Sequence, residues 1–189
     1  MPFLLFTARI RDPRKNVWML LRAFARVSAA HPDLKLVFIG DPPLDSHLAV
    51  RDECGLGDSV VFLPPLPRVE LVPYYQAAEL FVLSSSQEGL GISFIEALAC
   101  GLPVVATRCG GPEGVIIEGE TGWLVPNDDE AAFAGAILRA LSDPARLSAM
   151  RDNCRRYAER ELARPVVEEK LLAALREVFP THFREARDE

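Results

Sequence analysis

The sequence predicts an α/β fold with a doubly wound, mostly parallel sheet of about six strands and a C-terminal helical extension. Short apolar runs alternate with longer stretches in which apolar residues recur at helical spacing. Parallel strands need helical crossovers, so this alternation favours a parallel sheet with helices on both faces. After Asn127 the helical spacing continues without further apolar runs, which predicts the extension.

The expected strands are short apolar runs separated by turn residues and prolines, which cannot lie inside a sheet. They are Phe3 to Ala8, Lys35 to Gly40, Ser59 to Leu63, Leu80 to Ser84, Val104 to Thr107 and Trp123 to Val125. The turn Gly40 to Pro43 ends the second run, and Pro64 to Pro67 ends the third. The segment Gly101-Leu102-Pro103 stops a helix before the fifth run begins.

The expected helices lie between these runs and after the last one. They are Val17 to Val27, Asp45 to Cys54, Val69 to Ala78, the stretch from Ile92 to Cys100, Asp128 to Leu141, Pro144 to Arg160 and Pro165 to Val178. Asn16 is placed to cap the first helix, and Gly55 and Gly57 close the second. We expect one domain over residues 1–179 and a frayed tail over residues 180–189.

Composition excludes several classes of protein. The chain has 189 residues, of which 49% are apolar and 25% charged, as in globular domains. Its net charge of −6 argues against a broad nucleic-acid-binding face, and no apolar run approaches the ~20 residues of a membrane span. The four cysteines form no CxxC pair and no zinc spacing, which favours reduced thiols in a cytoplasmic protein and no metal site.

Glu96 is the most informative residue. It lies within Ile92 to Cys100, an apolar helical stretch typical of a core, where a carboxylate is costly unless it is hydrogen-bonded or paired. Glu88 precedes Gly89 and Gly91, where the fourth strand should turn into the helix at the carboxyl end of the sheet. Two acids and a glycine turn at a helix N-terminus indicate a site for a ligand with both hydroxyls and phosphate.

Several segments resemble one known family, in the same order along nearly the whole chain. Glu88 to Val105 resembles the E-x7-E signature of retaining glycosyltransferases of the GT-B fold, family 4. The further matching segments are Thr7-Ala8-Arg9-Ile10, Lys15-Asn16, Gly110-Gly111-Pro112-Glu113 and Thr121 to Pro126. Ala8 and Asn16 stand where the family has glycine, and the family's N-terminal, acceptor-binding half has no counterpart. The resemblance therefore implies a Rossmann-like donor-binding domain, one half of a GT-B fold.

The resemblance implies roles for the charged residues. Glu96 would hold the two ribose hydroxyls of a nucleotide, and Glu88 would contact the transferred sugar near its anomeric carbon. Arg9 and Lys15 would stabilise the diphosphate as it leaves. Each role has a structural alternative: Glu96 as a surface acid, Glu88 as an acid that favours the helix N-terminus, and the cations as part of a solvated basic turn.

The resemblance also implies contacts from the glycine-rich turns. Gly89, Leu90 and Gly91 would present backbone N–H groups to the phosphates, with a hydroxyl from Ser93 nearby. Gly110 and Gly111 would let the backbone approach the donor sugar. Turn geometry alone requires glycine equally, so both explanations hold together. Glu113 is better explained as the start of the next element, and Pro64 to Pro67 would cradle the base.

The implied function is donor binding by a hexosyltransferase that uses a nucleotide diphosphate sugar, retains anomeric configuration and needs no metal or other cofactor. The acceptor, a glycan, lipid or small molecule, would bind the missing half, so this chain alone would transfer negligibly. The full-length enzyme would be cytoplasmic or peripheral at a membrane, and an exposed cleft face would favour a homodimer. The alternative is a non-catalytic nucleotide-binding or partner module on the same fold. A nicotinamide-binding domain is disfavoured, because no G-x-G-x-x-G follows the first strand.

Overall fold

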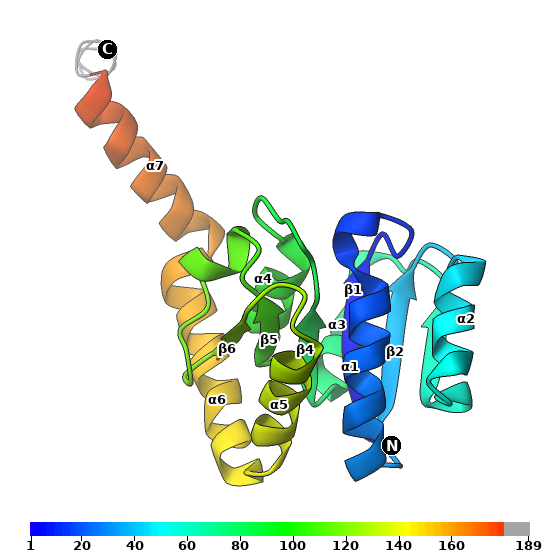
Figure 1. The fold of residues 1–189 in the computed structure, drawn as a ribbon. Helices are drawn as coiled ribbons and strands as arrows, with labels where there is room; N and C mark the ends of the chain where they lie inside the picture. Colours follow the sequence, from blue (N-terminus) through cyan, green and yellow to red (C-terminus); the bar gives the residue numbers. More distant parts are fainter. Residues whose placement is uncertain (180–189) are drawn as a thin grey trace.

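A computed structural model describes residues 1–179, which form a six-stranded parallel sheet between layers of helices (Figure 1). The strand order is β3-β2-β1-β4-β5-β6, and each neighbouring pair is parallel. The strands are β1 (Phe3–Ala8), β2 (Lys35–Gly40), β3 (Val60–Leu63), β4 (Leu80–Leu83), β5 (Val104–Thr107) and β6 (Gly122–Val125). The predicted fold class is confirmed, whereas the predicted tail lies outside the described residues.

The helices connect the strands and then continue past β6. They are α1 (Val17–Ala30), α2 (Asp45–Glu53), α3 (Arg68–Ala77), α4 (Ile92–Ala99), α5 (Glu130–Leu141), α6 (Pro144–Tyr157) and α7 (Arg164–Val178). The predicted helix Pro144 to Arg160 changes at Ala158 into a five-residue π-helical turn, Ala158–Leu162. Among the described residues, no helix combines the length and apolarity needed to cross a membrane.

Two separate hydrophobic clusters cover the two faces of the sheet. Helices α1, α5 and part of α6 cover one face, where Phe6 and Phe38 pack among buried helix residues such as Phe24 and Phe133. Helices α3 and α4 cover the other face, where Tyr75 and other buried side chains lie against Leu5, Phe81 and Leu83. Alternate residues of β1 therefore point into different clusters, as the pleat of a strand requires.

The strand order reverses between β1 and β4. From β1 the chain builds outward to β2 and β3, and then crosses back to β4 and continues to β6 on the other side. In doubly wound sheets the loops on either side of such a point diverge, which leaves a crevice at the carboxyl ends of the strands. The segments after β1 and β4, which contain Lys15 and Glu88, meet at this point.

Asn16 is the N-cap residue of α1, as predicted, but its side chain does not cap the helix. It precedes α1 in a left-handed conformation, with φ of 48°, and its side chain makes no capping hydrogen bond to the helix. Its amide instead donates to Asp128 Oδ1 at 2.6 Å, across the segment before α5. A long-range partner thus replaces the local cap, and asparagine tolerates the left-handed backbone better than most residues.

Helix α7 leads away from the sheet in Figure 1. None of its residues is buried, and the apolar side chains of Val167, Leu171 and Leu172 are exposed. It therefore contributes little to the core that positions the strands, and the central part of the molecule depends on residues before it.

Candidate functional site

A cleft of about 310 Å³ opens at the carboxyl end of the sheet, beside the point where the strand order reverses. Its walls come from the ends of β1 and β2, the proline loop after β3, one residue of α3 and the first turns of α4. Of the predicted site residues, Ser93 and Glu96 line it. The carboxylate that the sequence singled out therefore lies against a hollow.

Glu96 is held at both carboxylate oxygens. The Tyr75 hydroxyl donates to Oε2 at 3.1 Å, and the Arg68 guanidinium Nε lies 2.8 Å from Oε1. The Glu96 side chain keeps 23% of its surface exposed, toward the cleft. The core positions of α4 are taken by Phe94, Ala97 and Leu98, so Glu96 lies at the rim of the core and not inside it.

Tyr75 and Arg68 were not predicted as site residues. Both come from α3, which the sequence indicated only as a short helix. Tyr75 is the buried residue of that helix and shares a 2.8 Å hydrogen bond with Thr7 at the end of β1. Arg68 begins the helix and its side chain is 77% exposed. The signal that the sequence offered was the proline loop, which ends at Pro67, the residue before α3 begins.

Glu88 and Lys15 form an ion pair that was not predicted, although both residues were. The Lys15 ammonium donates to Glu88 Oε1, which also accepts a hydrogen bond from the Ser85 hydroxyl at 2.9 Å. Both charged side chains are largely shielded, with 15% and 11% of their surfaces exposed. The Ser84 hydroxyl donates to the Lys15 carbonyl at 2.7 Å, which ties together the segments after β1 and β4.

The two glycine-rich turns lie against each other. The backbone N–H of Gly111 donates to the Glu88 carbonyl at 3.0 Å, and Glu88 N–H donates to the Cys109 carbonyl at 2.7 Å. Gly110 has φ of 110°, and a Cβ there would lie 2.7 Å from the Glu88 carbonyl oxygen. A Cβ at Gly111 would lie 2.8 Å from the Gly89 carbonyl oxygen. Turn geometry therefore requires glycine at both positions, whatever else they do.

Leu90 and Gly91 lead into α4. Gly91 is the N-cap with φ of 71°, and a Cβ there would lie within 2.6 Å of the Phe94 ring. Leu90 and Ile92 are 59% and 56% exposed. The first helical N–H groups have no intrahelical partner, so this terminus can donate to an anion at the end of the cleft.

Arg9 is far more exposed to solvent than Lys15. Its side chain is 76% exposed and approaches Asp12 at 3.3 Å. Asp12 also accepts hydrogen bonds from Arg14, and chiefly that contact lowers the pKa of Asp12 to about 2. Arg9 therefore belongs to a solvent-exposed turn, and its predicted contact with a diphosphate stays a prediction.

Asp41 holds this turn through two hydrogen bonds from the turn's backbone. The backbone N–H of Ile10 donates to one oxygen of its carboxylate, and that of Arg11 to the other at 3.2 Å. Because both donors belong to the segment after β1, this contact sets the path of the chain toward Lys15. The resemblance did not indicate Asp41.

Comparison with known proteins decides the family. Residues 1–161 match the family described as Glycosyl transferases group 1. The chain belongs to this family. This glycosyl transferase chain is 36% identical over 157 residues to a D-inositol 3-phosphate glycosyltransferase of Acidothermus cellulolyticus. The match covers 78% of this chain and 35% of that protein.

Two further comparisons agree. A GDP-mannose-dependent alpha-(1-6)-phosphatidylinositol monomannoside mannosyltransferase of Mycolicibacterium smegmatis is 36% identical over 146 residues, which cover 73% of this chain and 38% of that protein. The solved structure of a sucrose-phosphate synthase from Thermosynechococcus elongatus matches with a TM-score of 0.83 and 32% identity, over 95% of this chain and 46% of that one. The glycosyl transferase chain thus spans little more than a third of the length of these two curated relatives.

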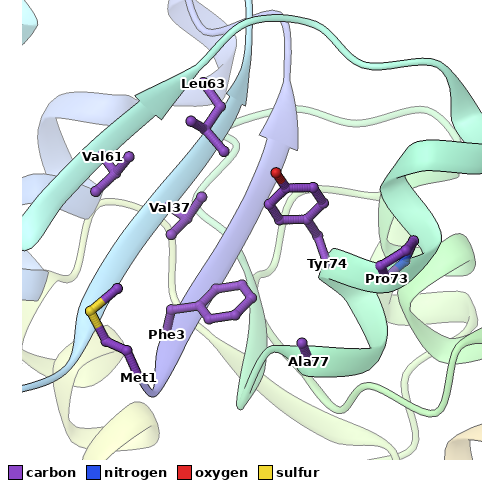
Figure 2. A pocket seen from close by; sticks show the side chains of 8 residues that line it. All are labelled: Met1, Phe3, Val37, Val61, Leu63, Pro73, Tyr74 and Ala77. Carbon is purple, nitrogen blue, oxygen red and sulfur yellow. The ribbon is translucent and has the colours of Figure 1, made fainter.

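A second hollow of this glycosyl transferase chain is larger and chemically different. It has a volume of about 400 Å³ and lies between the sheet and α3, near the start of β1 (Figure 2). Its lining is almost entirely apolar and comes from Met1, Phe3, Val37, Val61, Leu63, Pro73, Tyr74 and Ala77. It offers no carboxylate or cation to a phosphate or to hydroxyls, so the smaller cleft beside Glu96 is the candidate site. Within residues 1–179 there is no group of three acidic, histidine or cysteine side chains arranged to hold a metal ion.

Proposed function

We propose that this chain is the donor-binding domain of a retaining glycosyltransferase, which transfers a sugar from a nucleotide diphosphate sugar to an acceptor hydroxyl. One observation carries the proposal: the Glu96 carboxylate is tethered at the rim of a cleft at the carboxyl end of the sheet. Family membership supports glycosyl transfer, and the GDP-mannose dependence named for the mycobacterial relative supports a nucleotide donor.

The Glu96 carboxylate suits a ribose. An ionised carboxylate has about four lone-pair sites, and the partners on Glu96 are one hydroxyl and one guanidinium N–H. The sites toward the cleft, including the one that the exposed Arg68 side chain covers, can accept from the neighbouring O2′ and O3′ hydroxyls of a nucleotide. The base then lies toward the loop that contains Pro65 and Leu66, which line the same cleft.

The diphosphate is assigned to the start of α4. Backbone N–H groups of the turn Gly89-Leu90-Gly91 and of Ser93 lie close to Glu96 in sequence, and a helix N-terminus favours an anion. Lys15, a largely shielded cation in the segment after β1, is assigned to the diphosphate as well. In this assignment Arg9, on the same turn, adds charge at longer range.

Glu88 and the turn at Gly110 and Gly111 are assigned to the transferred sugar. Glu88 is joined to Lys15, so the sugar-binding acid and the phosphate-binding cation are neighbours, as the donor's own connectivity requires. In the reaction the acceptor oxygen forms a bond to the anomeric carbon while the bond to the leaving phosphate breaks. The acceptor proton passes to a leaving phosphate oxygen, so the step needs no metal or other cofactor.

The acceptor half is assigned to a part of the enzyme beyond this chain. The chain corresponds to about half of the matched solved chain, which supports one half of a two-domain GT-B enzyme. The acceptor is a glycan, a lipid or a small molecule with a free hydroxyl. We therefore expect this chain to bind a donor and to transfer negligibly.

Calorimetric titration with UDP and with GDP tests donor binding. We expect one of them to bind the wild-type chain, and Glu96→Ala to weaken binding at least tenfold, since two hydrogen bonds to a charged acceptor are lost. Glu70→Ala is the matched control, because it removes an exposed acid from α3 and should leave binding unchanged. Failure of the wild type to bind either nucleotide, or full binding by Glu96→Ala, contradicts the proposal.

A second experiment separates the enzyme from a non-catalytic nucleotide-binding module. The chain is mixed with the N-terminal half of the Acidothermus relative, and transfer from UDP- and GDP-sugars is measured. Donor turnover that requires both pieces supports the proposal. Donor binding with no transfer to any acceptor tested favours the module.

A further inference from the structure

A directed chain of hydrogen bonds connects the end of β1 to the cleft carboxylate. The Tyr75 hydroxyl lies 2.8 Å from Thr7 Oγ1 and 3.1 Å from Glu96 Oε2. A carboxylate accepts only, so the single phenolic hydrogen points to Glu96. Tyr75 must then accept from Thr7, and the direction of both bonds is set.

The hydrogen-bond chain is largely buried, and its two ends, Thr7 and Glu96, both line the cleft. Tyr75 and Thr7 are 2% and 7% exposed, and the Tyr75 ring lies against Phe81, with 5.9 Å between the ring centroids. Burial, reinforced by the nearby Glu96 charge, raises the pKa of Tyr75, so the phenol stays protonated throughout the neutral range. The hydroxyl is therefore a permanent donor to Oε2.

The second partner of Glu96 is exposed to solvent, whereas Tyr75 is buried. Arg68 approaches Oε1 from solvent, with a side chain that is 77% exposed. Ion pairs formed by such exposed side chains are weak and are screened by salt. One oxygen of Glu96 is thus held from within the protein, whereas the other is covered by a side chain that can leave.

We propose that Tyr75 is the positioning residue of the ribose subsite and that Arg68 is an exchangeable cap on it. This inference rests on the proposed function. Tyr75 orients the carboxylate without contacting the ligand, and Thr7 orients the Tyr75 hydroxyl. When a nucleotide binds, its ribose hydroxyls replace Arg68 at Glu96, while the bond to Tyr75 persists.

Paired nucleotides with and without ribose hydroxyls test the positioning role. The wild-type chain and Tyr75→Phe are titrated with UDP and GDP and with their 2′,3′-dideoxy forms. We expect Tyr75→Phe to weaken binding of the ribonucleotide on the order of tenfold, the effect of one hydrogen bond to a charged group. Binding of the dideoxy form should stay within twofold, because that ligand makes no use of Glu96.

Tyr74→Phe is the matched control for this experiment. It removes a phenolic hydroxyl from the neighbouring residue of α3, which lines the apolar hollow (Figure 2), and should leave both affinities unchanged. If Tyr75→Phe does not fold, Thr7→Val removes the donor to Tyr75 with little change of volume. It should produce the same selective loss, at about threefold.

Arg68→Ala tests the exchange. We expect it to leave ribonucleotide affinity unchanged or up to severalfold tighter, since no ion pair has to break before the hydroxyls bind. Arg26→Ala, which removes an exposed cation from α1, corrects for the change in net charge. A tenfold loss with Arg68→Ala but not with Arg26→Ala overturns the exchangeable cap.

These outcomes distinguish a failure of the positioning role from a failure of the proposed function. Equal weakening of ribo- and dideoxynucleotides by Tyr75→Phe, or no weakening at all, overturns the positioning role and leaves donor binding intact. If the wild-type chain binds neither UDP nor GDP, the proposed function fails and this inference fails with it.

Discussion

Replacement of Lys15 by methionine, combined with Glu88→Gln in a double-mutant cycle, measures the ion pair that joins the segments after β1 and β4. Both charged side chains are largely shielded, so the pair resembles a buried bridge more than an exposed one. Breaking a buried pair costs ~3–5 kcal/mol, whereas exposed pairs contribute ~0.2–1 kcal/mol. Glu88 also keeps the Ser85 hydroxyl as a partner, so Lys15→Met should cost about 2 kcal/mol.

Urea denaturation provides the assay. At a slope of about 3 kcal/mol/M, a loss of 2 kcal/mol lowers the urea midpoint by ~0.7 M. Glu88→Gln alone should cost about 1–1.5 kcal/mol and should cost little once Lys15→Met is present, so the coupling is about 1–1.5 kcal/mol. The control is the same cycle on Arg155 and Glu159, an exposed pair whose coupling should stay below ~0.5 kcal/mol. Equal coupling in both cycles would refute the reasoning.

The same variants should separate in nucleotide binding. Glu88→Gln leaves the Lys15 charge uncompensated, so UDP or GDP should bind as tightly as to the wild type or more tightly. Lys15→Met removes that charge and should weaken the same nucleotide on the order of tenfold. Parallel losses in the two variants, measured by calorimetry, would mean that the pair supports the fold and does not present Lys15 to a phosphate.

Two further perturbations follow from single positions. Gly110→Ala places a Cβ 2.7 Å from the Glu88 carbonyl oxygen at φ of 110°, so the free energy of unfolding should fall by about 2–3 kcal/mol. Gly89→Ala is the control, because a Cβ at Gly89 meets nothing within 4 Å. Equal urea midpoints for the two variants would contradict the packing of the two turns. The Arg14 contact lowers the pKa of Asp12 from 3.8 to about 2, so its stabilisation is present above pH 4 and is lost as the pH falls toward 2. Asp12→Asn should therefore flatten the stability profile between pH 4 and 2, and an unchanged slope in acid unfolding would argue against that contact.

The sheet could be predicted almost residue by residue because its strands are buried on both faces. Three strands, Phe3–Ala8, Lys35–Gly40 and Val104–Thr107, have the predicted bounds, since each is a mainly apolar run with a charged or turn residue directly after it. The other strands differ from the prediction by one residue at one end. Helix bounds matched less closely. Helix α1 begins at Val17 as predicted but continues to Ala30, past the predicted end at Val27, because no residue of the helix after Val27 is buried and the core-facing pattern stops there.

The acidic residues of the candidate site could be predicted from the sequence, but the residues that hold them in place could not. Glu96 and Glu88 stand out locally, because each is a charge at a position that favours apolar or glycine residues. Their partners Tyr75 and Lys15 lie 21 and 73 residues away, a separation that no local pattern can register. Glu96 also proved less buried than its neighbours suggested, since only one face of α4 meets the core.

A crystal structure of the chain with UDP or GDP bound tests the central claim most directly. The account predicts both ribose hydroxyls within hydrogen-bond distance of Glu96, the Tyr75 contact unchanged, Arg68 displaced, and the diphosphate at the start of α4. A nucleotide bound in the apolar hollow beside Tyr74, or a ribose that leaves the Arg68–Glu96 ion pair in place, would contradict it.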